Sequence, residues 1–309
     1  CGVLTPAAAP PMALLHCTSM LNMDETAIQR AAALIQNADA LVVAAGAGMG
    51  IDSGLPDFRG PGGFWAAYPA LGRRGLAFAA VANPHTFITD PALAWGFYGH
   101  RLALYRRTAP HQGFGILKGW AARMAQGCRV LTSNVDGQFQ RAGFSDEHIT
   151  ECHGSIHHLQ CSRPCCGDVW PADDFVPAVD DTTCTLANHP PTCPRCHAIA
   201  RPNIMMFDDH GWIDRRAKGQ EAGLRQWLDK ARRMVVIELG AGTAVPSVRH
   251  FSQALVAKHG ARLVRINPRE PAVPTRHDVS MASPALAGLQ AIEVLLAPPL
   301  AKPLLTAKQ

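Results

Sequence analysis

The chain reads LVVAAGAGMGIDSGLPDFRGPGG from Leu41 to Gly63, and this stretch decides the fold. The apolar run from Ala40 to Ala45 is long enough for one buried strand, and three glycines follow it closely. Glycine lets the backbone turn tightly, and α/β proteins bind a pyrophosphate at such a turn after a buried strand. The dehydrogenase pattern G-x-G-x-x-G, counted from Gly46, requires its third glycine at position 51. It is not met, because Ile51 stands there and the third glycine is Gly50. The stretch therefore predicts a nucleotide-binding turn of another kind.

The residues that follow these glycines are more specific. The loop reads SGLPDFRG over residues 53–60 and places a proline, an acid, an aromatic ring and a guanidinium side by side. Residues 46–60 resemble the signature G-A-G-x-S-x-x-[SA]-G-I-P-D-F-R of the sirtuins, the NAD-consuming protein deacylases, with Gly50 in place of the serine. The resemblance implies that NAD binds here, and the residues it assigns to NAD are Gly46, Ala47, Gly48, Asp57, Phe58 and Arg59.

Predicted strands and helices alternate along the chain. Strands are expected at 40–45, 129–132, 148–151, 234–239 and 262–266, and helices at 24–37, 91–107, 111–126 and 245–258. Such alternation predicts a parallel, doubly wound α/β sheet. Glycine and proline at 61–65 predict that the nucleotide loop continues there as mobile backbone.

Polar residues and glycines follow three of these strands, at the carboxyl ends where open α/β sheets hold ligands. They are Ser133, Asn134 and Asp136 after the second strand, Gly240, Ala241 and Gly242 after the fourth, and Asn267 after the fifth. A plain turn is the alternative for Asn134 and Asp136, because both residue types favour turns. Sirtuins have T-Q-N-[IV]-D at 132–136, with glutamine where this chain has Ser133, and the resemblance assigns the whole set to NAD.

The segment 151–154 resembles the His-Gly motif of sirtuins, in which the histidine is the general base. His153 directly follows a strand-like segment, and an imidazole with a pKa near 6.5 can accept a hydroxyl proton at neutral pH. A purely structural role is the alternative, since the chain contains 14 histidines. The expected catalytic residues are His153 and Asn134.

Six of the ten cysteines lie between Cys161 and Cys196. Cys193 and Cys196 form a CxxC pair, and Cys161 with Cys165 can supply the other pair, with Cys166 as the alternative to Cys165. Four thiolates close a tetrahedral zinc shell and leave no catalytic position open. The spacing predicts structural zinc that holds together a small insert with too little core to fold alone; cysteines without a metal are the alternative.

Two segments concern the acyl substrate. Tyr98 and Arg101 share a face of the helix predicted at 91–107, where a phenol and a guanidinium could hold a carboxylate. Sirtuins that remove succinyl or malonyl groups carry such a Tyr-x-x-Arg pair; an amphipathic tyrosine beside a solvated arginine is the alternative. Residues 201–209 resemble the sirtuin segment R-P-x-V-V-x-F-G-E, with Asp208 and Asp209 at its last two positions. The resemblance implies that an acyl-lysine peptide adds as a strand beside Ile204, Met205, Met206 and Phe207.

The resemblance implies a Rossmann-like, doubly wound parallel sheet with a small zinc-binding insert domain. Residues 1–22 are expected to form a flexible extension, 23–300 the catalytic domain and 301–309 a tail. Within the catalytic domain, the Rossmann-like part is predicted at about 23–85, 110–155 and 205–300, and the small domain at about 86–109 and 156–204.

The implied activity is NAD-dependent protein lysine deacylation, in which NAD is a consumed co-substrate. The acyl group passes to ADP-ribose, nicotinamide is released, and acidic acyl groups are the expected preference. One alternative is an ADP-ribosyltransferase or NAD glycohydrolase, which the departures at Gly50, Ser133 and Asp208–Asp209 favour. The other is a non-catalytic NAD-binding module.

Composition excludes several classes of partner. The net charge is only +5 and the basic residues are scattered, so nucleic acid is not expected. No run of about 18 apolar residues could span a membrane, and the apolar start of the chain lacks the basic flank of a secretory signal. Clustered cysteines favour a reducing, cytoplasmic location. The expected partner is an acyl-lysine protein or peptide, and the oligomeric state is not predicted.

Overall fold

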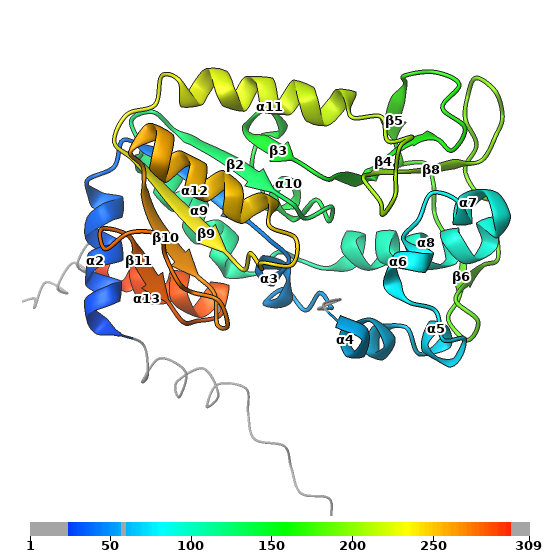
Figure 1. The fold of residues 1–309 in the computed structure, drawn as a ribbon, viewed down its shortest axis with the longest axis horizontal. Helices are drawn as coiled ribbons and strands as arrows, with labels where there is room; N and C mark the ends of the chain where they lie inside the picture. Colours follow the sequence, from blue (N-terminus) through cyan, green and yellow to red (C-terminus); the bar gives the residue numbers. More distant parts are fainter. Residues whose placement is uncertain (1–23, 57–59, 298–309) are drawn as a thin grey trace, which may run out of the picture.

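Six parallel strands form the larger sheet of the computed structural model, which describes residues 24–56 and 60–297, with the backbone alone at 60–62 (Figure 1). Their spatial order is β11-β10-β9-β1-β2-β3. In that order, the strands span Val279–Met281, Arg262–Ile266, Met234–Leu239, Ala40–Ala45, Cys128–Thr132 and Ile149–Glu151. All five neighbouring pairs are parallel, which confirms the predicted sheet.

Helices cover both faces of this sheet. The helices on one face are α2 (Glu25–Gln36), α9 (Gln112–Arg123) and α13 (Ala285–Leu296), and those on the other are α11 (Arg215–Leu228) and α12 (Ser247–His259). The odd-numbered residues of β1, from Leu41, pack in the core between the sheet and α2, α9 and α13. The even-numbered residues pack in the core between the sheet and α11 and α12. Successive side chains of a strand point to opposite faces, so a strand between two helix layers must be apolar throughout. This explains the unbroken apolar run before the glycines.

Most predicted elements agree with the structure to within three residues. The helix expected at 111–126 ends at Arg123, and the one expected at 245–258 begins at Ser247. Two helix starts have a clear local cause. The Asp24 carboxylate accepts a hydrogen bond from the Thr26 backbone at 2.9 Å, and the Asp90 carboxylate accepts one from Leu93 at 3.0 Å. Both are N-caps, which satisfy donors that a helix start leaves unpaired.

A second region combines short helices with an antiparallel sheet in the order β5-β4-β8. These strands span Val169–Pro171, Gly154–Cys161 and Ala200–Ile204, and a hairpin pairs β6 (Val179–Asp180) with β7 (Thr185–Leu186). The helices are α4 (Gly60–Ala67), α5 (Pro69–Arg73), α6 (Phe78–Val81), α7 (Thr86–Thr89) and α8 (Pro91–Arg107). Their apolar side chains form a core separate from the two cores of the large sheet.

The prediction of a loop at 61–65 is wrong, because α4 covers this segment. Phe64 is 1% exposed, and its ring centroid lies 5.6 Å from that of Tyr68 and 5.8 Å from that of Phe97. Burial of this ring favours an ordered helix despite the glycines around it. The contacts group residues 64–82 with α8, whereas the predicted division assigns them to the Rossmann-like part. The division into domains stays a prediction.

Several expectations fall outside the described residues. These are the extension at 1–22, the tail at 301–309, and the NAD assignments of Asp57, Phe58 and Arg59. Within the part of the chain that the structure describes, no helix has the length and apolar character needed to cross a bilayer.

Candidate active site

The glycine turn joins β1 to the short helix α3 (Gly48–Ile51) and packs against a second turn after β9. The Gly46 N–H donates to Leu239 O at 2.9 Å, and the Gly48 N–H donates to Gly240 O at 3.0 Å. A Cβ on Gly48 would lie 2.6 Å from the Gly240 Cα, and one on Gly46 would lie 2.8 Å from the Ala241 Cα. No side chain fits at either distance. The glycines are therefore required by the contact between two backbones, and this contact brings both predicted NAD turns together.

Asn134 lies against the same turn. Its side-chain amide donates to Gly46 O at 3.0 Å, and its backbone N–H donates to the Thr132 hydroxyl at 3.0 Å. The neighbouring Ser133 is held by its N–H, which donates to Ala45 O at 3.1 Å. The carboxyl ends of β1 and β2 thus meet as the sequence predicts. The roles of Ser133 and Asn134 in NAD binding stay predictions.

Asp136 is a buried carboxyl group beside this loop, 7% exposed. Burial raises its pKa to about 6, although its Oδ1 accepts the Gln138 N–H at 2.9 Å, which opposes that rise. A Cβ on Gly50 would lie 3.5 Å from the Asp136 Oδ2. Because Gly50 has no side chain, the Asp136 carboxyl group lies next to the backbone of residue 50.

His153 is half-buried in the link between β3 and β4. Its Nε2 lies 3.1 Å from the Ser247 Oγ, at the start of α12. Burial lowers the pKa of His153, and a hydrogen bond to the Ser133 backbone carbonyl partly offsets this effect. A lowered pKa favours the neutral imidazole, which is the form that can accept a proton. Sequence reasoning missed Ser247, whose only signal was its position near a predicted helix start.

Asn267 stabilises the turn that follows β9. It is 2% exposed, its amide donates to Ala241 O at 2.8 Å, and its Oδ1 accepts the Glu270 N–H at 3.0 Å. Glu270, also missed by the sequence analysis, accepts from the Thr243 backbone at 2.9 Å and from its hydroxyl at 2.8 Å. Gly240 has φ +58°, a conformation that favours glycine. The contacts give Asn267 a structural role, and its predicted contact with NAD stays a prediction.

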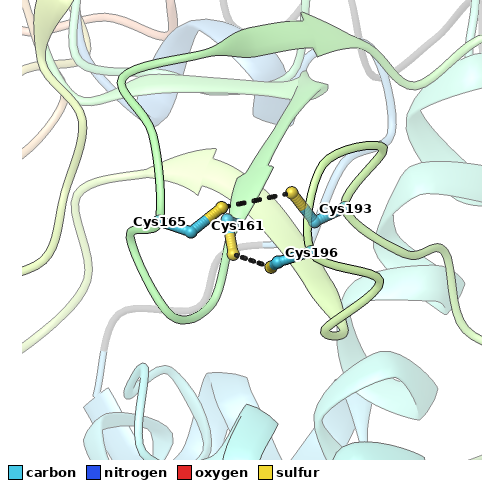
Figure 2. A group of neighbouring side chains, drawn as sticks. All are labelled: Cys161, Cys165, Cys193 and Cys196. Carbon is cyan, nitrogen blue, oxygen red and sulfur yellow. Dashed lines mark hydrogen bonds between the residues drawn. The ribbon is translucent and has the colours of Figure 1, made fainter.

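Four cysteines converge in the second region (Figure 2). The sulfurs of Cys161, Cys165, Cys193 and Cys196 all lie within 4.8 Å of one another. The Cys161–Cys196 and Cys165–Cys193 sulfur pairs are each 3.6 Å apart. Tetrahedral zinc with bonds of about 2.3 Å requires sulfurs about 3.8 Å apart. The cluster fits structural zinc, and it contains Cys165 rather than Cys166, as the sequence analysis preferred.

Tyr98 and Arg101 are both buried in α8, 1% and 8% exposed. The guanidinium carbon of Arg101 lies 5.7 Å from the Tyr98 ring centroid, so the two side chains share a face as predicted. Arg101 Nη2 also donates to the Tyr105 hydroxyl at 2.7 Å. The alternative of a solvated arginine is wrong, because aromatic rings of α8 surround this guanidinium.

The predicted peptide segment begins where the edge strand β8 ends. Met205 and Phe207 are 44% and 45% exposed, while Ile204 and Met206 are buried. The Met205 N–H donates to His153 O at 3.0 Å, which links this segment to the predicted base.

A buried ion pair holds the far end of this segment. Two oxygens of Asp209 accept from Arg201 at 2.8 Å each, and both side chains are at most 1% exposed. The Met206 N–H donates to the same carboxylate at 3.2 Å. Asp209, one of the departures from the sirtuin pattern, thereby fixes the loop.

Comparisons with known proteins agree with this geometry. The model of the Sir2 family matches residues 46–221. The chain is 32% identical over 247 residues to NAD-dependent protein deacylase 1 of Pseudomonas aeruginosa, covering 79% of this chain and 88% of that protein. It is 33% identical over 186 residues to the mitochondrial NAD-dependent protein deacylase sirtuin-5 of Danio rerio, covering 55% and 57%. Its fold is similar to that of a Sir2 homologue solved as an NAD complex, with TM-score 0.66, 23% identity, and coverage of 89% and 96%.

Proposed function

Because this chain belongs to the Sir2 family, we propose that it is an NAD-dependent protein lysine deacylase that transfers the acyl group to ADP-ribose and releases nicotinamide. The observation that carries the proposal is the position of His153. Its Nε2 lies 3.1 Å from the Ser247 hydroxyl, at the carboxyl ends of the strands, where Asn134 contacts the glycine turn. A neutral imidazole that already faces one hydroxyl is suited to accept a proton from another.

The residues present fit a dinucleotide. Glycine turns follow the adjacent strands β1 and β9, and open α/β sheets bind dinucleotides at such carboxyl ends. Bound NAD supplies the ribose carbon to which the acyl oxygen adds as nicotinamide leaves. In this proposal, Asn134 and Asp136 are the residues that would face the nicotinamide. With NAD bound, His153 would accept the proton of a ribose hydroxyl.

The acyl-lysine peptide is placed by β8 and the residues that follow it. β8 pairs only with β4 among the described strands of its sheet, so its other edge can accept an added strand. Met205 and Phe207 project from the continuation of this edge and offer apolar contacts to the peptide. The backbone hydrogen bond between Met205 and His153 keeps the peptide segment close to the base.

A preference for succinyl- or malonyl-lysine is the finer part of this proposal. The support is the burial of Arg101, whose guanidinium shares a face of α8 with Tyr98. Away from bulk water, the attraction between a guanidinium and a carboxylate is stronger than it is between solvated groups. We expect Arg101→Met to lower turnover of succinyl-lysine peptide at least about tenfold relative to acetyl-lysine peptide. Arg107→Met, which changes an exposed arginine of the same helix, is the control.

The main test follows labelled NAD with acetyl- and succinyl-lysine peptides. We expect nicotinamide and O-acyl-ADP-ribose in equal amounts, and a loss of about 10² to 10⁴-fold in turnover for His153→Ala. The matched control is His148→Ala, which removes an exposed histidine before β3. Unchanged turnover in His153→Ala would refute the assigned base.

The same assay separates the alternatives. Label that stays on protein would indicate an ADP-ribosyltransferase, and ADP-ribose formed without peptide would indicate a glycohydrolase. NAD binding without any turnover would indicate a binding module.

A further inference from the structure

A cavity of about 710 Å³ is lined by residues of the zinc-bearing insert and of the first two turns of α11. Trp170 of β5 and Pro194 line one side, and Arg215, Arg216 and Gln220 line the helix side. Figure 1 shows this end of α11 beside β5. None of the residues predicted to bind NAD or the peptide lines the cavity, so the proposed reaction does not account for it.

The cavity has an excess of positive charge. Arg216 Nη2 lies 2.6 Å from Glu151 Oε2, and the Asp168 carboxylate lies 2.6 Å from Arg195 Nε. Arg215 is exposed and adds a third guanidinium against these two carboxylates. The start of a 14-residue helix adds partial positive charge, and the side chain of its first flanking residue, Asp214, does not cap it.

Two buried polar atoms at the cavity lack partners among the described residues. They are the Nδ1 of His158 and the Nη1 of Arg216, both in side chains that line the cavity. Arg216 is 19% exposed, so its guanidinium is largely removed from bulk water. Buried polar groups in folded proteins nearly always have a hydrogen-bond partner. A ligand atom in the cavity is a suitable partner for the Arg216 nitrogen.

Four of the residues that the insert contributes to the lining are apolar. Trp170 and Val169 of β5 are half-buried, and Pro171 and Pro194 complete this side. Cavities of roughly 300–1,000 Å³ suit small organic ligands. A tryptophan ring stacks on planar bases whatever their sequence, and guanidinium pairs bind phosphate. These apolar residues and the arginines together define a ligand with a flat ring and an anionic group.

We propose that this cavity binds a phosphate monoester of mononucleotide size, with its phosphate on Arg215 and Arg216 and its ring on Trp170. The ligand would enter beside Glu151, the last residue of β3 and two residues before His153. It would accept a hydrogen bond from the Nη1 of Arg216 and leave the contact between Nη2 and Glu151 in place. Binding in the cavity does not depend on the proposed deacylase activity, because no residue assigned to that activity lines the cavity. The cavity is nevertheless next to the segment that carries His153.

The test is calorimetric titration of the full chain with AMP. We expect Arg215→Gln, a surface change, to weaken AMP binding roughly tenfold. Arg225→Gln on the same helix is the matched control, because Arg225 is exposed and lies outside the cavity. This variant should bind AMP with the same affinity as the original chain. Inorganic phosphate should bind more weakly than AMP, and Trp170→Leu should remove that difference.

Three results would overturn the proposal. One is the absence of saturable AMP binding. Another is equal affinity in Arg215→Gln and the original chain, which would place AMP elsewhere, such as on the glycine turn. Equal affinity for AMP and inorganic phosphate would refute the role of the ring. The His153→Ala variant separates the two proposals, because it should lose deacylase turnover and still bind AMP with unchanged affinity.

Discussion

The two regions of this chain are held together by different forces. In the large sheet, all six residues of β1 are buried, and helices pack on both faces. The second region has an apolar core of its own around α8, but its four clustered cysteines lie outside that core, and the two-residue strands β6 and β7 contain no buried residue. Hydrophobic burial is sufficient where a strand lies between two layers. A small unit whose cysteines lie outside a core can gain its folding free energy from a bound metal.

The largest expected effect is the loss of zinc. Structural zinc contributes on the order of 10 kcal/mol to small metal-dependent units, so Cys165→Ser should lose the metal and unfold the insert. The large sheet should keep its slow hydrogen exchange, because its cores contain none of these cysteines. The measurement is elemental analysis with exchange mapped by mass spectrometry.

The adjacent thiol provides the control for that experiment. Cys166 lies outside the four-sulfur cluster, so Cys166→Ser should retain about one zinc per chain. A metal-free Cys166→Ser with a zinc-loaded Cys165→Ser would reverse the ligand assignment. A fully folded chain without metal would refute the contrast between the two regions.

A smaller effect is expected from the buried ion pair of the second region. Asp209→Asn leaves the Arg201 guanidinium buried without its carboxylate, which costs roughly 3–5 kcal/mol in such sites. Denaturant unfolding should show this loss, and exchange should increase first around 204–207. Glu221→Gln breaks the exposed pair with Arg225 and should change stability by less than about 1 kcal/mol. Equal effects of the two variants would contradict the role given to Asp209.

The smallest effect concerns Asp136, at the junction of the regions. Its pKa is raised by burial from the ordinary 3.8 to about 6, so the native state binds this proton more tightly than the unfolded chain does. Its contribution to stability is favourable below pH 4 and is lost as the pH rises to about 6. Above that, ionising the buried carboxyl costs roughly 3 kcal/mol. Asp136→Asn should therefore raise the melting temperature at pH 7, and less so at pH 5. An equal gain at both pH values would show that the effect does not come from ionisation.

Several features of both regions could be predicted because their signals are local. The apolar run before the glycines, the polar residues after three of the strands and the spacing of Cys193 and Cys196 are all visible in short segments. The helix at 60–67 could not be predicted in this way. Its three glycines and one proline indicate a loop, and the burial of Phe64 against other rings, including the distant Phe97, outweighs that tendency.

The sequence by itself determined the alternation of the five predicted strands with their helices, the glycine turn and the clustering of the cysteines, because periodicity and spacing are visible in short segments; the structure added the remaining elements and placed Cys165 rather than Cys166 in the cluster. Only the tertiary structure decided that Gly48 packs on Gly240, that Ser247 faces His153 and that Arg101 is buried among aromatic rings. These contacts join segments far apart in the chain or depend on burial. Their energies come from close packing and exclusion of water, which exist only once the chain has folded.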